Sequence, residues 1–527
     1  MGALCCKGCR NLMEPAARHI AVVGGGTAGW LAALVLRRNF PDSTKSPLRI
    51  SVVESPNIPT VGVGEGSTSV FRHVLMDLGI DEEEFLRETG ATIKFGIKHD
   101  GWRADKGTYY GPIDDPSALV PPPDGSHRPW LQTAQLASGK PVADIHLFTW
   151  LMQRKKSPFF RNAGGSMHPV SPFHHAYHFD QARLGRFLAT KAKGIDHILA
   201  EVQGIDRNGE NGQITHLLLQ DAEALPVDLV IDCTGFRRAI IGQLGARWHS
   251  YSDFLPLNKA MPFWLDHSAN DEIAPYTLAK AMDAGWMWQI PTQDRIGCGY
   301  VFSDAHISPD EATRELQSII SNKVESRGLI TIDPGRLEST WIKNCIAVGL
   351  AQSFLEPLEA TSIHGTLVQL LILCRLDLSK LVGNSATEKI RENYSHTVAS
   401  QVDDFAQFIH LHYADGRQDT AFWKSVAQKG PTDQGRKKLA IWQSEPIDRT
   451  HFSAFPADLP HVQEQLYLPV MDGLSLLPRA ASKKALAGDA GIRSAARKTI
   501  SELVPEFRKA STKAIGHREY LEAIAAT

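Results

Sequence analysis

The sequence predicts an α/β protein with a doubly wound parallel sheet, followed by a mainly helical C-terminal part. A short apolar strand at 19–23 runs into glycines, then into a helical segment and a second strand at 48–54. A third buried strand is indicated at 227–233. Its apolar core lies between Asp228 and Asp232, and a small-residue turn follows it. Helical composition then dominates over 362–377 and 387–414. A strand–glycine–helix–strand start with later buried strands is typical of this fold class.

The bulk composition indicates a globular protein with a small-molecule substrate. Of its 527 residues, 43% are apolar and 22% are charged, which is an ordinary balance. The net charge of −2 provides no basic field for nucleic acid or an anionic membrane. No apolar run is long enough to span a bilayer, so we expect a soluble, cytoplasmic protein. Seven cysteines do not suggest a disulfide framework, and we expect no metal site.

We expect three parts along the chain. Residues 1–18 read as a disordered leader, 19–375 as a cofactor-binding and catalytic module, and 376–527 as a helical substrate or cover module packed into the same body. Residues 60–70 form a glycine-dense loop. Residues 103–145 are rich in Gly, Pro and Asp, which favours irregular surface structure.

The first turn predicts a dinucleotide site. Residues 24–29 read Gly-Gly-Gly-Thr-Ala-Gly and match G-x-G-x-x-G between a strand and a helix. Such glycines let the backbone approach a pyrophosphate, and the N-terminus of the helix stabilises its charge. Glu54 ends the second strand, where it can accept a hydrogen bond from a ribose hydroxyl. The expected contacts are Gly24, Gly26, Thr27, Ala28, Gly29 and Glu54.

Two distant segments favour FAD over NAD. The strand within 227–233 ends at a small-residue turn, and the strand at 345–349 ends at Gly349. Such segments suit a long cofactor that returns to the sheet, with Gly349 beside it, whereas an NAD enzyme needs only the first motif. Each segment taken alone fits an ordinary core strand equally well.

One motif is more specific. Residues 286–291 read Trp-Met-Trp-Gln-Ile-Pro and match W-x-W-x-I-P. This motif is a hallmark of the flavin-dependent halogenases. Four other stretches also match the tryptophan halogenase family, in the family's order: Val23–Trp30, Val61–Glu65, His175–Asp180 and Phe354–Glu359. The chain from about 19 to 375 therefore resembles this family. The C-terminal third resembles the family only loosely, mainly at Gly473–Pro478.

The resemblance implies a large FAD-binding flavoprotein fold and a defined chemistry. Reduced flavin (FADH2), O2 and chloride or bromide would give hypohalous acid, which halogenates an electron-rich aromatic ring. Trp286 and Trp288 share one face of a strand and would form a wall that keeps the substrate from the flavin. No second nucleotide motif is evident, so a separate NAD(P)H-dependent flavin reductase is expected to supply FADH2.

The resemblance also assigns two catalytic residues. Lys94, in Lys-Phe-Gly-Ile-Lys, would act on hypohalous acid either as an ammonium donor or as an amine that forms a haloamine. Glu359 would orient the oxidant and stabilise the cationic ring, or accept its proton. Glu356 is the more structural acid of this segment. Backbone amides of Thr361 and Ser362, at a helix start, would hold the halide.

Departures from the family concern the substrate and the halide. Ser362 stands where the family usually has glycine, which leaves the halide preference open. His461 and Val462 occupy the positions of the aromatic pair that clamps free tryptophan. A histidine expected after the Lys94 segment is missing, and Tyr109–Pro112 occupies that region. We therefore expect indole or another electron-rich aromatic, and not free tryptophan, as the substrate.

Two other functions share parts of the pattern. An FAD-dependent aromatic monooxygenase would have the nucleotide motif, but it would give no reason for Lys94 or the Trp-x-Trp pair. A non-catalytic flavoprotein would be expected to lack Lys94 or Glu359, and both are present. The sequence is compatible with a monomer or a homodimer.

Overall fold

The structure is a computed structural model of the chain. It describes residues 18–43, 47–58, 64–123, 125, 129–268, 271–320, 324–377, 388–414, 416–452, 455–456, 459, 461 and 464–526. Residues 1–17 of the expected leader and part of the glycine-dense loop lie outside these residues. The leader was expected to extend to residue 18, but Arg18 begins the first strand, β1 (Arg18–Val23), so that bound is wrong by one residue. None of the helices in the described part of the chain is both long and apolar enough to cross a membrane.

A six-stranded sheet forms the first layer, and it confirms the doubly wound core. Its order is β10 (Asp196–Leu199), β2 (Leu48–Glu54), β1 (Arg18–Val23), β14 (Leu229–Asp232), β23 (Cys345–Ala347) and β22 (Trp341–Ile342). All neighbours pair in parallel except β22. Helix α1 (Thr27–Asn39) connects β1 to β2. The central strands β1, β14 and β23 are mainly apolar and buried, as expected for a parallel sheet that is covered on both faces.

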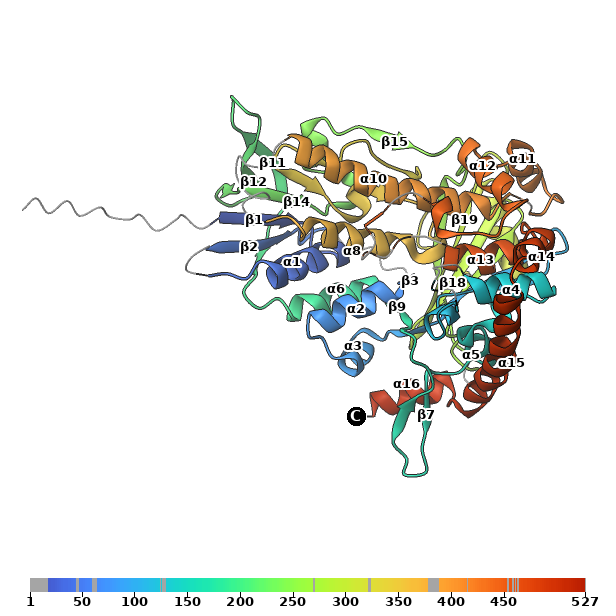
Figure 1. Cartoon of the computed structure of the whole chain (residues 1–527). Helices are drawn as coiled ribbons and strands as arrows, with labels where there is room; N and C mark the ends of the chain where they lie inside the picture. Colours follow the sequence, from blue (N-terminus) through green and yellow to red (C-terminus); the bar gives the residue numbers. More distant parts are fainter. Residues whose placement is uncertain are drawn as a thin grey trace, which may run out of the picture.

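A second, seven-stranded sheet lies at the other end of the molecule (Figure 1). Its order is β20 (Ile330–Thr331), β16 (Lys259–Asp266), β19 (Arg295–Phe302), β18 (Gly285–Pro291), β17 (Thr277–Met282), β5 (Gly96–Asp100) and β6 (Thr108–Pro112). A small sheet of β3 (Gly64–Gly66), β9 (Ala176–Asp180) and β4 (Thr92–Lys94) contacts β18. The minor strands are β7 (Phe159–Arg161), β8 (Met167–Pro169), β11 (Val202–Arg207), β12 (Ile214–Leu219), β13 (Leu225–Pro226), β15 (Trp248–Ser250), β21 (Gly335–Leu337) and β24 (Ser353–Phe354).

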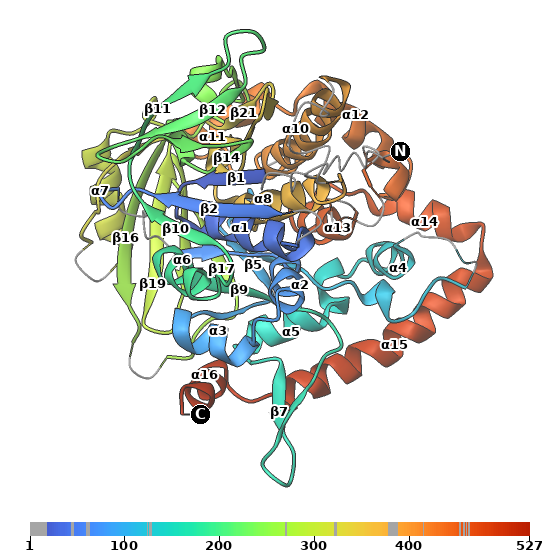
Figure 2. The same ribbon diagram turned by 90° about the vertical axis from the view of Figure 1, so that its left-hand side faces the viewer.

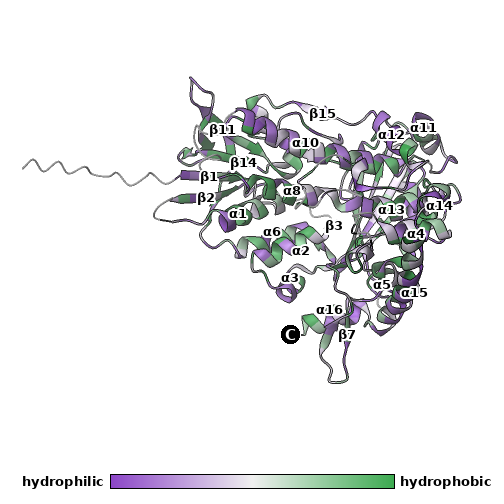
Figure 3. Cartoon of the chain, in the orientation of Figure 1, coloured by the Kyte–Doolittle hydropathy of each residue, from purple (hydrophilic) through white to green (hydrophobic). Residues whose placement is uncertain are grey.

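Helices surround both sheets and dominate the C-terminal part. They are α2 (Ser69–Asp77), α3 (Glu82–Thr89), α4 (Trp130–Ser138), α5 (Leu147–Arg154), α6 (Gln181–Thr190), α7 (Pro309–Ile319), α8 (Thr361–Leu373), α10 (Glu388–Leu411), α11 (Ala421–Lys429), α12 (Asp433–Trp442), α13 (Glu464–Gly473), α14 (Arg479–Ala487), α15 (Ala490–Lys513) and α16 (His517–Ala525). Figure 3 shows apolar strands inside and hydrophilic residues on outer helices such as α15. The expected boundary between modules at 375/376 stays a prediction.

The expectation of irregular surface over 103–145 is wrong. This segment contains strand β6 and helix α4, and Trp130 and Leu131 of α4 are buried. Helices α14 and α15 pack against α4, as Figure 2 shows along one edge of the molecule. Gly and Pro correctly indicate where regular structure is interrupted in this segment. Its helix α4 was not predicted because the residues that bury it lie far along the chain.

Candidate active site

The glycine turn after β1 has the geometry of a pyrophosphate-binding turn. Gly24 has φ +114°, and a Cβ at this position would lie 2.4 Å from the carbonyl oxygen of Cys233. A Cβ at Gly29 would lie 1.8 Å from the Gly24 oxygen, so α1 packs closely against the turn. Helix α1 has Gly26 as its N-cap, with no side-chain cap and no acidic residue in its first turn. Its N-terminal amides therefore fit an anionic group.

Glu54 and Gly349 both lie beside this turn. A Cβ at Gly25 would lie 2.1 Å from Cδ of Glu54, so the carboxyl group lies against the turn. Its Oε2 lies 2.8 Å from Nε2 of His197. Gly349 has φ +67°, and a Cβ there would be 2.8 Å from Cβ of Ala28. The segment after β23 thus meets the start of α1, as a cofactor that returns to the sheet requires.

Lys94 ends β4 and is buried. Its ammonium donates a hydrogen bond to the Ser67 carbonyl at 3.0 Å. A Cβ at Gly66 would lie 3.1 Å from Nζ, so the ammonium lies against β3. Burial lowers the pKa of Lys94 to about 8, and the negative charges of Glu359 and Glu65 oppose that effect.

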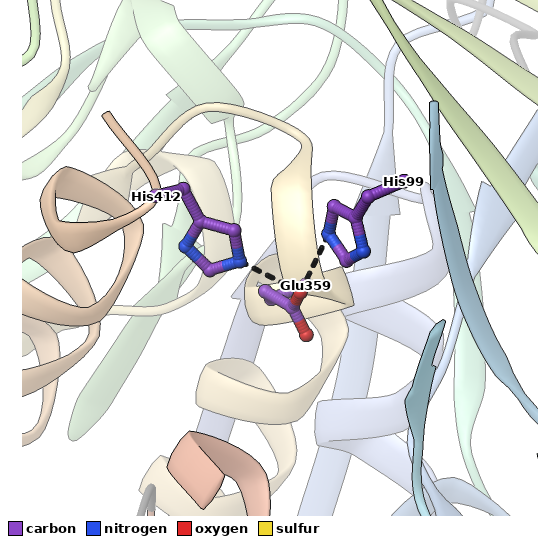
Figure 4. Close-up of side chains that lie close together, drawn as sticks. All are labelled: His99, Glu359 and His412. Atoms are coloured by element: carbon purple, nitrogen blue, oxygen red, sulfur yellow. Dashed lines mark hydrogen bonds and ion pairs between the residues drawn. The ribbon is translucent and has the colours of Figure 1, made fainter. Parts of the chain in front are cut away.

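Glu359 lies in the turn that precedes α8. Glu359 and Ala360 have φ of 66° and 53°, and two consecutive left-handed residues other than glycine are energetically unfavourable. This backbone directs the carboxyl group towards two imidazoles (Figure 4). Its Oε1 lies 3.2 Å from Nε2 of His412 and 3.3 Å from Nε2 of His99. Burial alone would raise the pKa of Glu359, but these contacts lower it well below its usual range.

Sequence reasoning missed both histidines. His99 lies on β5, directly after Lys98 and before the Tyr109–Pro112 region in which the family histidine was expected. His99 and Lys94 lie on strands that follow each other in the chain, β5 and β4, but that belong to different sheets, and both side chains are buried. His412 follows α10, where no family motif was found, and only the fold brings it to Glu359.

Two imidazoles and a carboxylate are also a set that transition metals accept. The nearest polar atoms of His99, Glu359 and His412 all lie within 4.8 Å of one another. The two shorter separations, 3.2 Å and 3.3 Å, are close to ordinary hydrogen-bond lengths, and we interpret them in that way. The expectation of no metal site stays a prediction.

The Trp-x-Trp pair lies on β18. Trp286 and Trp288 are buried in the same apolar cluster, whereas Met287 packs into another, so the two indoles share one face as expected. Trp288 lies over Gly299 of β19, where a Cβ would come within 2.0 Å of its ring. Only glycine leaves room for the ring at that position, so the wall depends on both strands.

Glu356 links Trp286 of this wall to the segment that carries Glu359 through hydrogen bonds. The indole Nε1 of Trp286 donates to its Oε2 at 3.2 Å, and the hydroxyl of Tyr413 donates to the same oxygen. Burial raises the pKa of Glu356 to about 7, and the two donors only partly offset that effect. Glu356 thus contacts an indole and a phenol hydroxyl, whereas Glu359 contacts two imidazoles.

Thr361 and Ser362 begin α8, which no side chain caps within the described part of the chain. Both border a small cavity with Gln401 and Phe405. The side chain of Ser362 bonds to Glu65, and burial raises the pKa of this carboxyl group to about 7. Helix N-terminal amides that no side chain caps, beside a small cavity, fit a halide ion.

His461 has partners of its own. Its Nε2 lies 2.8 Å from Oδ2 of Asp404, and its ring stacks on Phe455 at 4.3 Å. Val462 lies outside the described residues. Glu464 and Tyr467 on α13, which sequence reasoning did not single out, each have a buried side-chain oxygen without a hydrogen-bond partner among the described residues.

Comparisons with known proteins agree with this geometry. The family model for tryptophan halogenase matches residues 19–489. Tryptophan 6-halogenase SttH of Streptomyces toxytricini is 31% identical and covers 88% of this chain and 91% of its own. The 7-chloro-L-tryptophan 6-halogenase KtzR of Kutzneria sp. is 29% identical over 95% of this chain and 98% of its own.

Solved structures extend the match to the fold. The SttH crystal structure has a TM-score of 0.85 and 28% identity, over 97% of this chain and 100% of that chain. The flavin-dependent halogenase BrvH of Brevundimonas sp. BAL3 has a TM-score of 0.80 and 28% identity, over 97% and 100%. A family of this kind implies FAD and a halide. The chain belongs to the tryptophan halogenase family and is a flavin-dependent halogenase.

Proposed function

We propose that this enzyme halogenates indole or another electron-rich aromatic, and that Lys94 and Glu359 direct the oxidant to the ring. Reduced FAD, with O2 and chloride or bromide, supplies hypohalous acid to the site. The ammonium of Lys94 polarises the hypohalous acid, and Glu359 stabilises the positive charge of the ring. As the carbon–halogen bond forms, the halogen–oxygen bond breaks, and the released hydroxide and the ring proton leave as water.

One observation carries this proposal. Lys94 and Glu359 come from distant segments but meet at one site. The Lys94 side chain is buried, the Glu359 side chain is only 10% exposed, and the charge of Glu359 acts on Lys94. Two facing negative groups favour the ammonium form of Lys94, which supports the role of hydrogen-bond donor over that of haloamine. Opposite charges gathered in a buried site are costly to desolvate and are typical of functional sites, which supports a catalytic role.

The remaining residues hold the reactants. FAD is held by Gly24, Gly26, Thr27, Ala28, Gly29, Glu54 and Gly349, and the halide by Thr361 and Ser362. Trp286 and Trp288 wall off the ring-binding space. Residues 19–375 form the catalytic module, and 376–527 cover it. A separate NAD(P)H-dependent reductase supplies FADH2, and the protein acts as a monomer or a homodimer.

Free tryptophan is not the preferred substrate. At the clamp region, His461 stands in place of an aromatic clamp residue, and its ring is held by Asp404 through Nε2 and by stacking on Phe455. The names of the relatives SttH and KtzR state a tryptophan substrate, so indole turnover would separate this chain from them.

The test compares indole with tryptophan at equal concentration. The protein is incubated with FAD, a flavin reductase, NADH and bromide, and products are identified by mass. Brominated indole, formed faster than brominated tryptophan, is expected. Comparable turnover of tryptophan would overturn the substrate assignment. An oxygenated product would instead favour a monooxygenase, and no product from either compound or from other electron-rich aromatics would favour a non-catalytic flavoprotein.

A further inference from the structure

His412 has a ring whose two nitrogens face different acceptors. Its Nδ1 lies 2.9 Å from the carbonyl oxygen of Phe408, which can only accept, so Nδ1 carries a proton. Its Nε2 lies 3.2 Å from Oε1 of Glu359. A carboxylate also only accepts, so this contact is favourable when Nε2 carries the second proton. The geometry therefore points to an imidazolium that faces Glu359, although His412 itself is fully buried.

His99 is the second imidazole beside the Glu359 carboxyl group. Its Nε2 lies 3.3 Å from the same oxygen, slightly long for a hydrogen bond. Its ring is stacked on Tyr109, with centroids 4.5 Å apart, and its Nδ1 has no partner among the described residues. Burial lowers the pKa of His99, which makes a positive charge on this ring less favourable. Glu359 thus has one hydrogen-bonded imidazole, that of His412, and a second imidazole, that of His99, whose Nε2 lies 3.3 Å away.

Two other buried carboxyl groups of this structure provide an internal comparison. Among the described residues, the hydrogen-bond donors to Glu65 and Glu356 are uncharged, and burial raises the pKa of each carboxyl group to about 7. The Glu359 side chain is only 10% exposed, but its contacts with His412 and His99 lower its pKa. The other titratable groups that face Glu359 are Lys94 from β4 and Tyr109 from β6.

We infer that His412, assisted by His99, is a positioning residue that holds Glu359 as a permanent carboxylate, so that Glu359 acts as a fixed negative charge and not as the proton acceptor. This inference rests on the proposed role of Glu359 in halogenation. A carboxylate bound by an imidazolium is a weak base, which suits it to stabilise a cationic ring without taking its proton. The ring proton then leaves with the hydroxide released from hypohalous acid.

The first test is the pH dependence of indole bromination in three variants. In His412→Phe, burial should raise the pKa of Glu359 towards those of Glu65 and Glu356, near 7. The rate should then fall about fivefold from pH 8 to pH 6, because an about tenfold loss of the Glu359 carboxylate is partly offset by an about twofold gain in charged Lys94. The wild type should change less than about twofold over this range. His412→Gln keeps a neutral donor, so the rate at pH 8 should largely recover while the fall at low pH persists.

A matched control lies on the same segment. His410 is also buried and binds two backbone carbonyls, of Phe254 and Gly430, but it does not contact Glu359. His410→Phe should lower the rate equally at all pH values or not at all. The inference would be overturned if His412→Phe behaved in the same way, because its role would then be structural only.

A second readout does not depend on activity. Infrared difference spectra between pH 8 and pH 5.5 report protonation of carboxyl groups, and Glu359→Gln identifies the band of Glu359. No such band is expected in the wild type, whereas His412→Phe should show one. A Glu359 band in the wild type would contradict the inference even if the enzyme did not brominate indole. The failure of bromination with the expected spectra would instead reject only the proposed function.

Discussion

Lys94 and Glu359 are both buried charged groups of one site, but the fold supports them differently. Lys94 has one backbone partner, the Ser67 carbonyl, and burial lowers its pKa to about 8. Glu359 has two imidazole partners, and their contacts outweigh burial and lower its pKa. Burial opposes the charged form of both groups, so the partners decide which group can titrate near neutral pH.

Lys94 and Glu359 should therefore lose their charges in different pH ranges. The charged form of Lys94 is present below about pH 8 and is lost as the pH rises through that value. The charged form of Glu359 is lost only as the pH falls far below the usual range of a carboxyl group. Changes at the Lys94 end should therefore affect the alkaline side of the pH profile, and changes at the histidines the acidic side.

Removal of the Lys94 side chain should have the largest effect. Lys94→Ala leaves hypohalous acid without its donor, so indole bromination should fall by about 100-fold or more, as for loss of a transition-state donor. FAD binding, measured by fluorescence titration, should survive because the glycine turn is unchanged. Lys98→Ala is the matched control, since Lys98 is partly exposed on the adjacent strand. Bromination that persists in Lys94→Ala would show that the mechanism is wrong.

Glu65→Gln should change bromination less than Lys94→Ala does, by moving the pH dependence of Lys94. The negative charge of Glu65 raises the pKa of Lys94, and burial leaves Glu65 ionised above about pH 7. Its loss should move the alkaline fall in bromination to lower pH by about half a unit, as expected for one nearby charge. The exposed Glu88→Gln provides the control. A shift to higher pH would mean that Glu65 does not stabilise the ammonium.

A chelator should have the smallest effect. We interpret the contacts among His99, Glu359 and His412 as hydrogen bonds, so overnight dialysis against EDTA should change the bromination rate less than about twofold. Metal analysis of the dialysed protein provides the check that removal is complete. Loss of activity that Zn²⁺ restores would show that the cluster holds a metal and would reject the hydrogen-bond interpretation.

The sequence predicted local features well. Strand β1, its glycine turn, α1 and Glu54 follow one another closely, so the pattern alone fixes them. The i, i+2 spacing of Trp286 and Trp288 likewise predicted their common face, since a strand alternates its side chains.

The support of Glu359 could not be predicted in this way. His412 follows a helix that carries no family motif, and it reaches Glu359 because α10 packs against α8, the helix that follows Glu359. Helix α4 was missed for the same reason, since its burial comes from α14 and α15. Contacts between distant segments depend on packing and leave no periodic signal in the sequence.

The pH–rate profile of indole bromination by the wild type tests the contrast between Lys94 and Glu359 most directly. FADH2 is supplied by excess reductase at a constant rate, and bromide is saturating. The predicted profile is level from about pH 5.5 to 7 and falls above about pH 8 as Lys94 loses its proton. A fall below pH 7 would show that Glu359 titrates, and a rise through pH 8 would show that the free amine of Lys94 is the active form; either result would contradict this account.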